Sequence, residues 1–223
     1  MKIGATCLAL STLVLASGCV SWTHAPGRNL TAGTPEIFSI KTPQLCQPGT
    51  CTLQGPGGEV RFSEVSTSGF GNRRDRTSFD IDYQRWKGLC RGPHSGVDGL
   101  GSRPFECTLM ERGTGESATL TVGEGCATAR LVYPNGRALE LRTDTAGAFG
   151  YVAPAREVSL VEGEQIVVFS DRTAAYIAFH RAPKTTLATE QVLAILAMHT
   201  YAELEGHPPE CLVRAGATTA STP

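Results

Sequence analysis

The sequence predicts a mainly β protein, either an antiparallel β-sandwich or a barrel-like domain, with one C-terminal α-helix. The first observation behind this prediction is a series of short runs, rich in β-branched, aromatic and aliphatic residues, that recurs from residue 36 onward. The second is the supply of turn residues, since the chain holds 25 Gly and 13 Pro and only 18% charged residues. The third is that no helical pattern alternates with these runs, which argues against the βαβ units of a parallel sheet.

Each expected strand is a short run that ends at turn residues. The runs are Glu36–Lys41, Glu59–Val65, Ser78–Trp86, Pro104–Glu111, Ala118–Val122, Ala127–Tyr133, Ala138–Thr143, Phe149–Ala153, Glu157–Val161, Gln165–Ser170 and Ala174–His180. They predict a single disulfide-stapled, β-rich domain over residues 36–211, which is long enough to enclose a large core.

One hairpin can be predicted to its register, in the segment ATARLVYPNGRALELRT. A two-residue turn would pair Leu131 with Glu140, whereas a three-residue loop that begins at Pro134 pairs Leu131 with Leu139. The longer loop keeps one face of the hairpin apolar. It also suits the fixed φ of Pro134 and gives the left-handed position to Gly136, so we expect the longer loop.

The expected helix covers residues 189–205. Thr189 is a suitable N-cap, and Glu190 favours the first turn. An apolar stripe at helical spacing consists of Leu193, Leu196, Ala197 and Tyr201. Because the opposite face carries Thr, Gln, His and Glu, we expect an amphipathic helix that packs one face on the sheet. Gly206 ends the helix, and the small polar residues 212–223 are expected to be disordered.

The first residues have the organisation of a bacterial export signal. A lysine precedes an uncharged, mostly apolar run that is too short to span a bilayer, and small residues follow the run. The sequence LASGC, ending at Cys19, resembles the lipobox of bacterial lipoproteins, with its large aliphatic residue one place early. The resemblance implies that residues 1–18 are a signal peptide and that Cys19 carries the lipid, with palmitate among its acyl chains. Cleavage by the general signal peptidase at the same bond would instead give a secreted protein.

By the same resemblance, Val20 in place of an aspartate after the lipidated cysteine points to the outer membrane of a two-membrane bacterium. Residues 19–35 have no hydrophobic periodicity and contain Pro, Gly, Thr and Asn. We therefore expect a flexible tether between the lipid and the domain.

The number of cysteines supports the lipoprotein interpretation. The chain has eight, and removal of Cys7 with the signal leaves seven, which would strand one thiol in an oxidising compartment. Setting Cys19 aside leaves an even set that can pair completely. The expected disulfides are Cys46–Cys51, Cys90–Cys107 and Cys126–Cys211. For Cys46 and Cys51, which enclose QPGT, a disulfide is favoured over zinc because the two-plus-two pattern of a zinc ribbon is missing.

The glycine-rich stretch between Cys90 and Cys107 is the best candidate for a ligand-contacting loop. It holds His94, Ser95, Asp98 and Arg103. A His, a Ser and an Asp in one disulfide-closed loop are the residue types of nucleophilic catalysis, but the G-x-S-x-G elbow is missing. A solvated loop is therefore the favoured interpretation.

A second candidate is the acidic pair in SFDIDYQRW, where alternation places Asp80 and Asp82 on one strand face. Two such carboxylates can bind Ca²⁺ or act as an acid and base pair. The following Gln84 and Arg85 break the EF-hand pattern, and a solvated strand face is favoured.

Charge and motifs limit the function classes. The net charge is −1, so no global basic field predicts nucleic-acid binding. We find no H-E-x-x-H, S-x-x-K or phosphate-cradling glycine motif, and we predict no metal, no cofactor and no assigned catalytic residue. The sequence predicts a lipid-anchored envelope lipoprotein with a binding or structural role, whose partners are the membrane, through its anchor, and an envelope protein or polymer. The alternative is a hydrolase of an envelope polymer that uses the acidic pair or the His94 loop.

Overall fold

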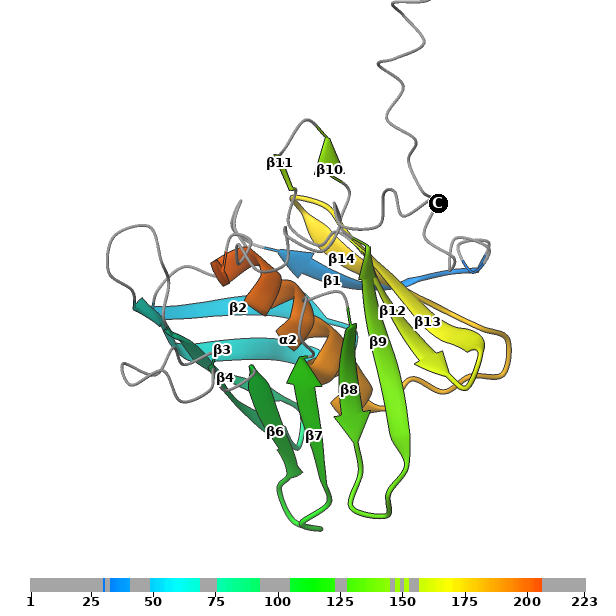
Figure 1. Ribbon diagram of the computed structural model, residues 1–223, viewed down its shortest axis with the longest axis horizontal. Coiled ribbons are helices and arrows are strands. Elements are labelled where there is room, and N and C mark those ends of the chain that lie inside the picture. Colours follow the sequence, from blue (N-terminus) through cyan, green and yellow to red (C-terminus); the bar gives the residue numbers. More distant parts are fainter. Residues whose placement is uncertain are drawn as a thin grey trace, which may run out of the picture.

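Twelve antiparallel strands close into a barrel, and one helix follows them. The computed structural model in Figure 1 describes residues 30, 33–40, 49–68, 76–92, 105–122, 128–144, 147–148, 151–152 and 157–205. The barrel confirms the predicted mainly β class and decides between the two predicted architectures.

The barrel is a continuous meander. Its strands are β1 (Glu36–Ile40), β2 (Gly49–Gly55), β3 (Gly58–Ser68), β4 (Arg76–Tyr83), β5 (Trp86–Gly92), β6 (Glu106–Glu111), β7 (Ser117–Val122), β8 (Thr128–Val132), β9 (Ala138–Asp144), β12 (Glu157–Glu162), β13 (Gln165–Arg172) and β14 (Tyr176–Arg181). Each strand pairs with the next one along the ring, and β1 pairs with β14 to close it. A separate two-stranded sheet consists of β10 (Gly147–Ala148) and β11 (Tyr151–Val152).

Two barrel strands were not predicted. The expected strand Ser78–Trp86 ends at Tyr83, and a turn leads into β5, while β2 lies where only a turn was expected. Both strands contain glycine, which weakens strand patterns in a sequence. In β5 a larger residue would force its neighbours to shift, because a Cβ on Gly88 would lie 2.6 Å from Cγ2 of Ile81 and 2.8 Å from Cδ2 of Leu109.

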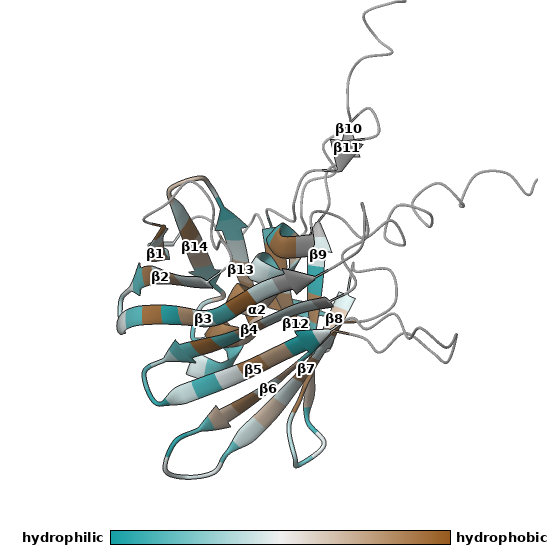
Figure 2. Cartoon of the chain, turned by 90° about the vertical axis from the view of Figure 1, so that its left-hand side faces the viewer, coloured by the Kyte–Doolittle hydropathy of each residue, from teal (hydrophilic) through white to brown (hydrophobic). Residues whose placement is uncertain are grey.

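The inward side chains of the strands form the apolar core. Figure 2 shows hydrophilic and hydrophobic residues alternating along β3 and β5, as expected when one strand face is buried. Rings connect the wall to the helix: Phe62 contacts Phe79, Phe79 contacts Phe105, and Phe105 stacks on Tyr201 of the helix with centroids 4.1 Å apart. The barrel and the helix therefore share one core.

The helix α2 (Thr189–Glu205) lies inside the barrel rather than on an outer face (Figure 1). Every residue from 191 to 201 is buried, and Leu193 and Ile195 on different sides of the helix are both fully enclosed. The prediction of an amphipathic helix with one solvent-facing side is therefore wrong. The sequence pattern misled because polar Gln191, His199 and Thr200 are enclosed with the apolar residues.

The start of α2 also differs from the expectation. Ala188 takes the cap position, since its carbonyl accepts from the N–H groups of Gln191 and Val192. In turn, the Gln191 side-chain oxygen accepts a hydrogen bond from the Ala188 N–H at 3.3 Å. Thr189 instead donates its hydroxyl to Gln84 Oε1 at 3.0 Å, which ties the helix start to the turn between β4 and β5.

The predicted hairpin register is confirmed. Leu131 pairs with Leu139 across β8 and β9, and Arg130 pairs with Glu140. The Gly136 N–H donates to the Tyr133 carbonyl at 2.9 Å, which closes the three-residue loop.

Candidate functional site

Asp80 and Asp82 lie on the outer face of β4, alternating with the core residues of that strand. Asp80 pairs with Lys87 through Oδ2 at 3.0 Å and with Arg91 through Oδ1 at 2.7 Å. Asp82 pairs with Arg112. Because cations neutralise each carboxylate separately, the pair is not arranged as an acid and a base around a common substrate.

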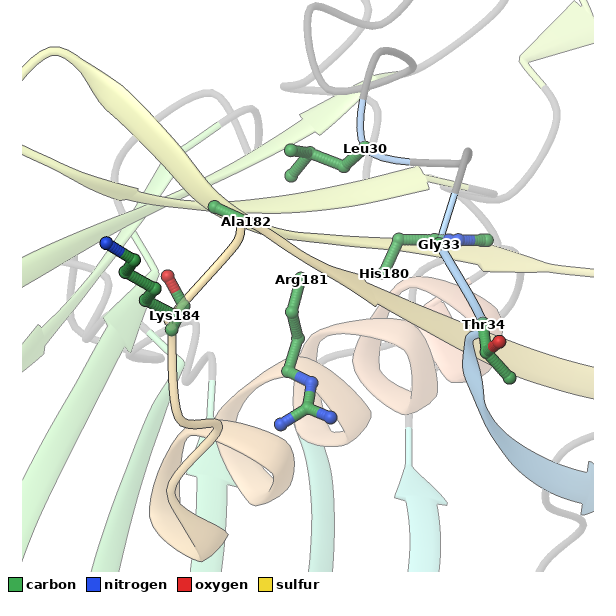
Figure 3. Close-up of a pocket in the computed structure, with 8 residues that line it drawn as sticks. Leu30, Gly33, Thr34, His180, Arg181, Ala182 and Lys184 are labelled. Atoms are coloured by element: carbon green, nitrogen blue, oxygen red, sulfur yellow. The ribbon is translucent and has the colours of Figure 1, made fainter.

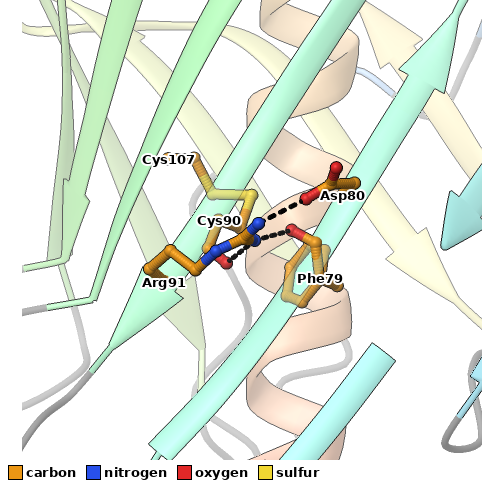
Figure 4. Close-up of a disulfide and its surroundings, with 5 residues drawn as sticks. All are labelled: Phe79, Asp80, Cys90, Arg91 and Cys107. Atoms are coloured by element: carbon orange, nitrogen blue, oxygen red, sulfur yellow. Dashed lines mark hydrogen bonds and ion pairs between the residues drawn. A yellow bond between two sulfur atoms is a disulfide. The ribbon is translucent and has the colours of Figure 1, made fainter. Parts of the chain in front are cut away.

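The surroundings of Asp80 keep its carboxylate ionised. Burial alone would raise the pKa of Asp80, but hydrogen bonds from Arg91 and Lys87, together with their charges, outweigh that effect and lower the pKa. Figure 4 shows the Arg91 guanidinium also donating to the carbonyls of Phe79, at 2.9 Å, and Cys90, at 2.7 Å. These bonds fix the guanidinium in place, so the cluster acts as a structural tie between β4 and β5.

The predicted Cys90–Cys107 disulfide is present (Figure 4). The two cysteines face each other across β5 and β6, are fully buried, and have Cα atoms 4.0 Å apart. Cys51 is also disulfide-bonded. The remaining predicted site residues lie outside the described residues; they are Cys19, Cys46, Cys126, Cys211, His94, Ser95, Asp98 and Arg103.

A buried serine and histidine meet inside the barrel. Ser170 Oγ on β13 lies 3.0 Å from His199 Nε2 on α2, and both residues are fully buried. The Ser170 hydroxyl donates to the Val158 carbonyl at 3.0 Å. A catalytic serine would instead give this proton to the histidine, so the geometry is that of a structural polar pair.

A pocket of about 230 Å³ lies at the end of β14. On one side it is lined by the segment that precedes β1, and on the other by the strand end and the turn that follows it. The lining residues are Leu30, Gly33, Thr34, His180, Arg181, Ala182, Lys184 and Thr185. Figure 3 shows the His180 ring directed toward Gly33, while Arg181 and Lys184 extend from the strand end and the turn.

The polar groups of this pocket are incompletely paired. His180 is 8% exposed, and the described residues offer its buried Nδ1 no hydrogen-bond partner. Arg181 pairs with Glu36 at 3.1 Å. The part of the chain that the structure describes offers Lys184 no ion-pair partner. The pocket therefore combines an unsatisfied imidazole nitrogen with two cationic side chains.

Sequence reasoning did not single out this pocket. In the sequence, His180 simply follows the apolar run AAYIAF, which is the setting of a structural histidine, and Lys184 is marked only by its place after Pro183. The pocket joins residues near position 30 with residues near position 180. No local pattern could have indicated that contact.

Within the described ranges, no group of three or more His, Cys, Asp or Glu side chains could hold a metal ion. The same residues include no helix with the length and apolarity of a membrane span.

No family model, curated protein or solved structure matches this chain. The function must therefore be inferred from the geometry and the sequence of the chain itself.

Proposed function

We propose that this protein is a lipid-anchored component of the bacterial cell envelope that binds a ligand or partner at its surface, or serves there as a structural module. The anchoring part of the proposal is supported by the LASGC pattern after the apolar leader and by the even number of cysteines that remains once Cys19 is set aside.

One observation limits where binding would take place, which is that a helix of the chain itself fills the barrel. Leu193, Ile195 and Leu196 of α2 occupy the space that a ligand would take inside a β-barrel. With the helix inside the barrel, a ligand or partner would therefore contact the outer face of the barrel, its rims or the connecting loops. The pocket at β14 is one such place.

The hydrolase alternative gains no support from the acidic pair. A general acid and a general base need carboxyl groups whose environments separate their pKa values around a shared substrate. Asp80 and Asp82 are each held by cations instead. We therefore propose binding rather than catalysis as the role.

The proposed location is the outer membrane of a two-membrane bacterium, with the lipid on Cys19 as the anchor. Each buried acyl CH₂ contributes about 0.8 kcal/mol, and two or more chains give stable attachment. The proposed partners are the membrane, through this anchor, and an envelope protein or polymer.

The anchor is tested by metabolic labelling with radioactive palmitate, followed by fractionation of the cells. We expect the wild-type protein to be labelled and membrane-bound, and Cys19→Ala to be unlabelled, soluble and folded by circular dichroism. Cys7→Ala is the matched control, because Cys7 belongs to the leader and its loss should change neither labelling nor location. Labelling of Cys19→Ala would overturn the proposed anchor.

The binding role is tested with the soluble Cys19→Ala chain and envelope fragments from cells that lack the protein. We expect saturable co-sedimentation without release of soluble polymer fragments. Release of fragments that increases with time would show a hydrolase and contradict the proposal.

A further inference from the structure

We propose that the pocket at the end of β14 binds one small anionic group, a phosphate or a carboxylate. The inference rests on the proposed binding function and names the ligand chemistry of that function. The pocket has a volume of about 230 Å³, which is below the range usual for drug-sized ligands and suits a single compact group.

The first argument is the unpaired nitrogen of His180. A buried polar atom without a partner costs about 1–3 kcal/mol, so such atoms are rare unless a ligand or water satisfies them. His180 lines the pocket, and its Nδ1 is buried without a hydrogen-bond partner among the residues that the structure describes. When Nδ1 carries the proton, it donates a hydrogen bond to an anionic oxygen. Thr34 and Thr185 line the same pocket, and a threonine hydroxyl can also donate a hydrogen bond.

The second argument is the charge of the lining. Arg181 and Lys184 are both cationic, and the described lining residues include neither Asp nor Glu. Glu36 lies nearby and pairs with Arg181, so it offsets part of the positive charge. Lys184 is left as the cation that a ligand can neutralise.

The third argument is the backbone of Lys184. The turn from Ala182 to Thr185 is closed by a bond from the Thr185 N–H to the Ala182 carbonyl at 3.0 Å, and Pro183 occupies its first corner. Lys184 has a φ of 67°, a conformation that costs a residue with a Cβ about 1–2 kcal/mol. A positive φ at the second corner after a proline is the pattern of a type II turn, and this turn fixes the backbone that carries Lys184 at the pocket.

The anion has two possible sources. Leu30 is eleven residues after Cys19 in the sequence, and eleven residues reach at most about 38 Å. If Cys19 is anchored, Leu30 therefore stays within about 38 Å of the membrane surface, where lipid phosphates are abundant. A soluble phosphate or carboxylate compound offers the same chemistry.

The site is tested first by calorimetric titration of the full mature chain with inorganic phosphate at constant ionic strength. We expect saturable binding of one phosphate per chain. Lys184→Gln and His180→Gln should each weaken it by about five- to tenfold, with folding checked by circular dichroism. Arg61→Gln removes the same charge from an exposed position on β3 and should change the affinity by less than twofold.

The two sources are separated by sedimentation of the soluble Cys19→Ala chain with phosphatidylglycerol vesicles, using phosphatidylcholine vesicles as the comparison. If the chain sediments only with phosphatidylglycerol vesicles, and Lys184→Gln sediments less, the ligand is a lipid headgroup. If the chain binds phosphate but does not sediment with vesicles, the ligand is a soluble anion. The proposal is wrong if neither probe binds, or if Arg61→Gln weakens binding as much as Lys184→Gln. Such a failure leaves palmitate labelling and envelope co-sedimentation unchanged, so it is distinguishable from failure of the proposed function.

Discussion

Ser170 on β13 and His199 on α2 are hydrogen-bonded at 3.0 Å inside the barrel, and neither residue is exposed to solvent. The Ser170 hydroxyl donates to the Val158 carbonyl, so its oxygen is the acceptor in the His199 tautomer that carries a proton on Nε2. An enclosed polar pair of this kind is satisfied in only one orientation of the helix. The pair therefore helps to specify which side of α2 meets β13.

Ser170→Ala should destabilise the protein by about 1–3 kcal/mol, because it leaves His199 Nε2 buried without its partner. Urea denaturation monitored by circular dichroism measures this change. A cost below about 0.5 kcal/mol for Ser170→Ala would contradict the structural role of the pair.

Asp80 should make folding stability depend on pH in the acid range. Its pKa in the folded protein is lowered from the ordinary 3.8, so its stabilising contribution is present above about pH 4 and is lost as the pH falls through the folded-state value. Asp80→Asn should cost about 1 kcal/mol at pH 7, after allowance for the partly exposed Lys87 and Arg91.

The measurement for Asp80 is urea denaturation of the wild type and Asp80→Asn between pH 2 and pH 7. The difference between the two proteins should shrink as the pH falls below about 4. Asp82→Asn is a useful comparison, because Asp82 is the more exposed member of the acidic pair and should cost less at pH 7. A difference for Asp80→Asn that is constant with pH would show that the ionised carboxylate does not stabilise the barrel.

Gly88→Ala should destabilise the barrel, although alanine is the smallest possible addition. Its methyl group would lie 2.6 Å from Ile81 and 2.8 Å from Leu109, and both neighbours are enclosed in the core. Overpacking of this kind costs about 1–3 kcal/mol. Thr108→Ala, on the outer side of the adjacent β6, should stay within about 0.5 kcal/mol of the wild type in thermal unfolding. Equal melting temperatures for Gly88→Ala and wild type would mean that this part of the core has room to relax.

The features that the sequence predicted correctly have local causes. The β8–β9 register follows from Pro134, Gly136 and the alternation on either side of them, and all of this information lies within one hairpin. The position of α2 depends instead on the strands that surround it. Its enclosed His199 looked like a solvent-facing residue because its partner, Ser170, is 29 residues away. The β14 pocket was missed for the same reason, since its two walls are about 150 residues apart in the sequence.

Gly136 gives the cleanest test of the predicted hairpin. Its φ is 82°, and a Cβ built on it would meet nothing within 4 Å, so a substitution there is penalised by backbone conformation and not by a clash. Gly136→Ala should cost about 1 kcal/mol, and Gly136→Val should cost more, because a β-branched residue is least compatible with the left-handed region.

The matched control for this hairpin is Asn135→Asp. The Asn135 side-chain oxygen accepts from the Arg137 N–H at 2.9 Å, and an aspartate oxygen can accept the same bond. Its melting temperature should therefore stay close to that of the wild type, while Gly136→Ala and Gly136→Val lower it in that order. If Gly136→Val had the same melting temperature as the wild type, the loop could adopt another conformation at no cost. The left-handed conformation of residue 136 would then not determine the pairing of Leu131 with Leu139.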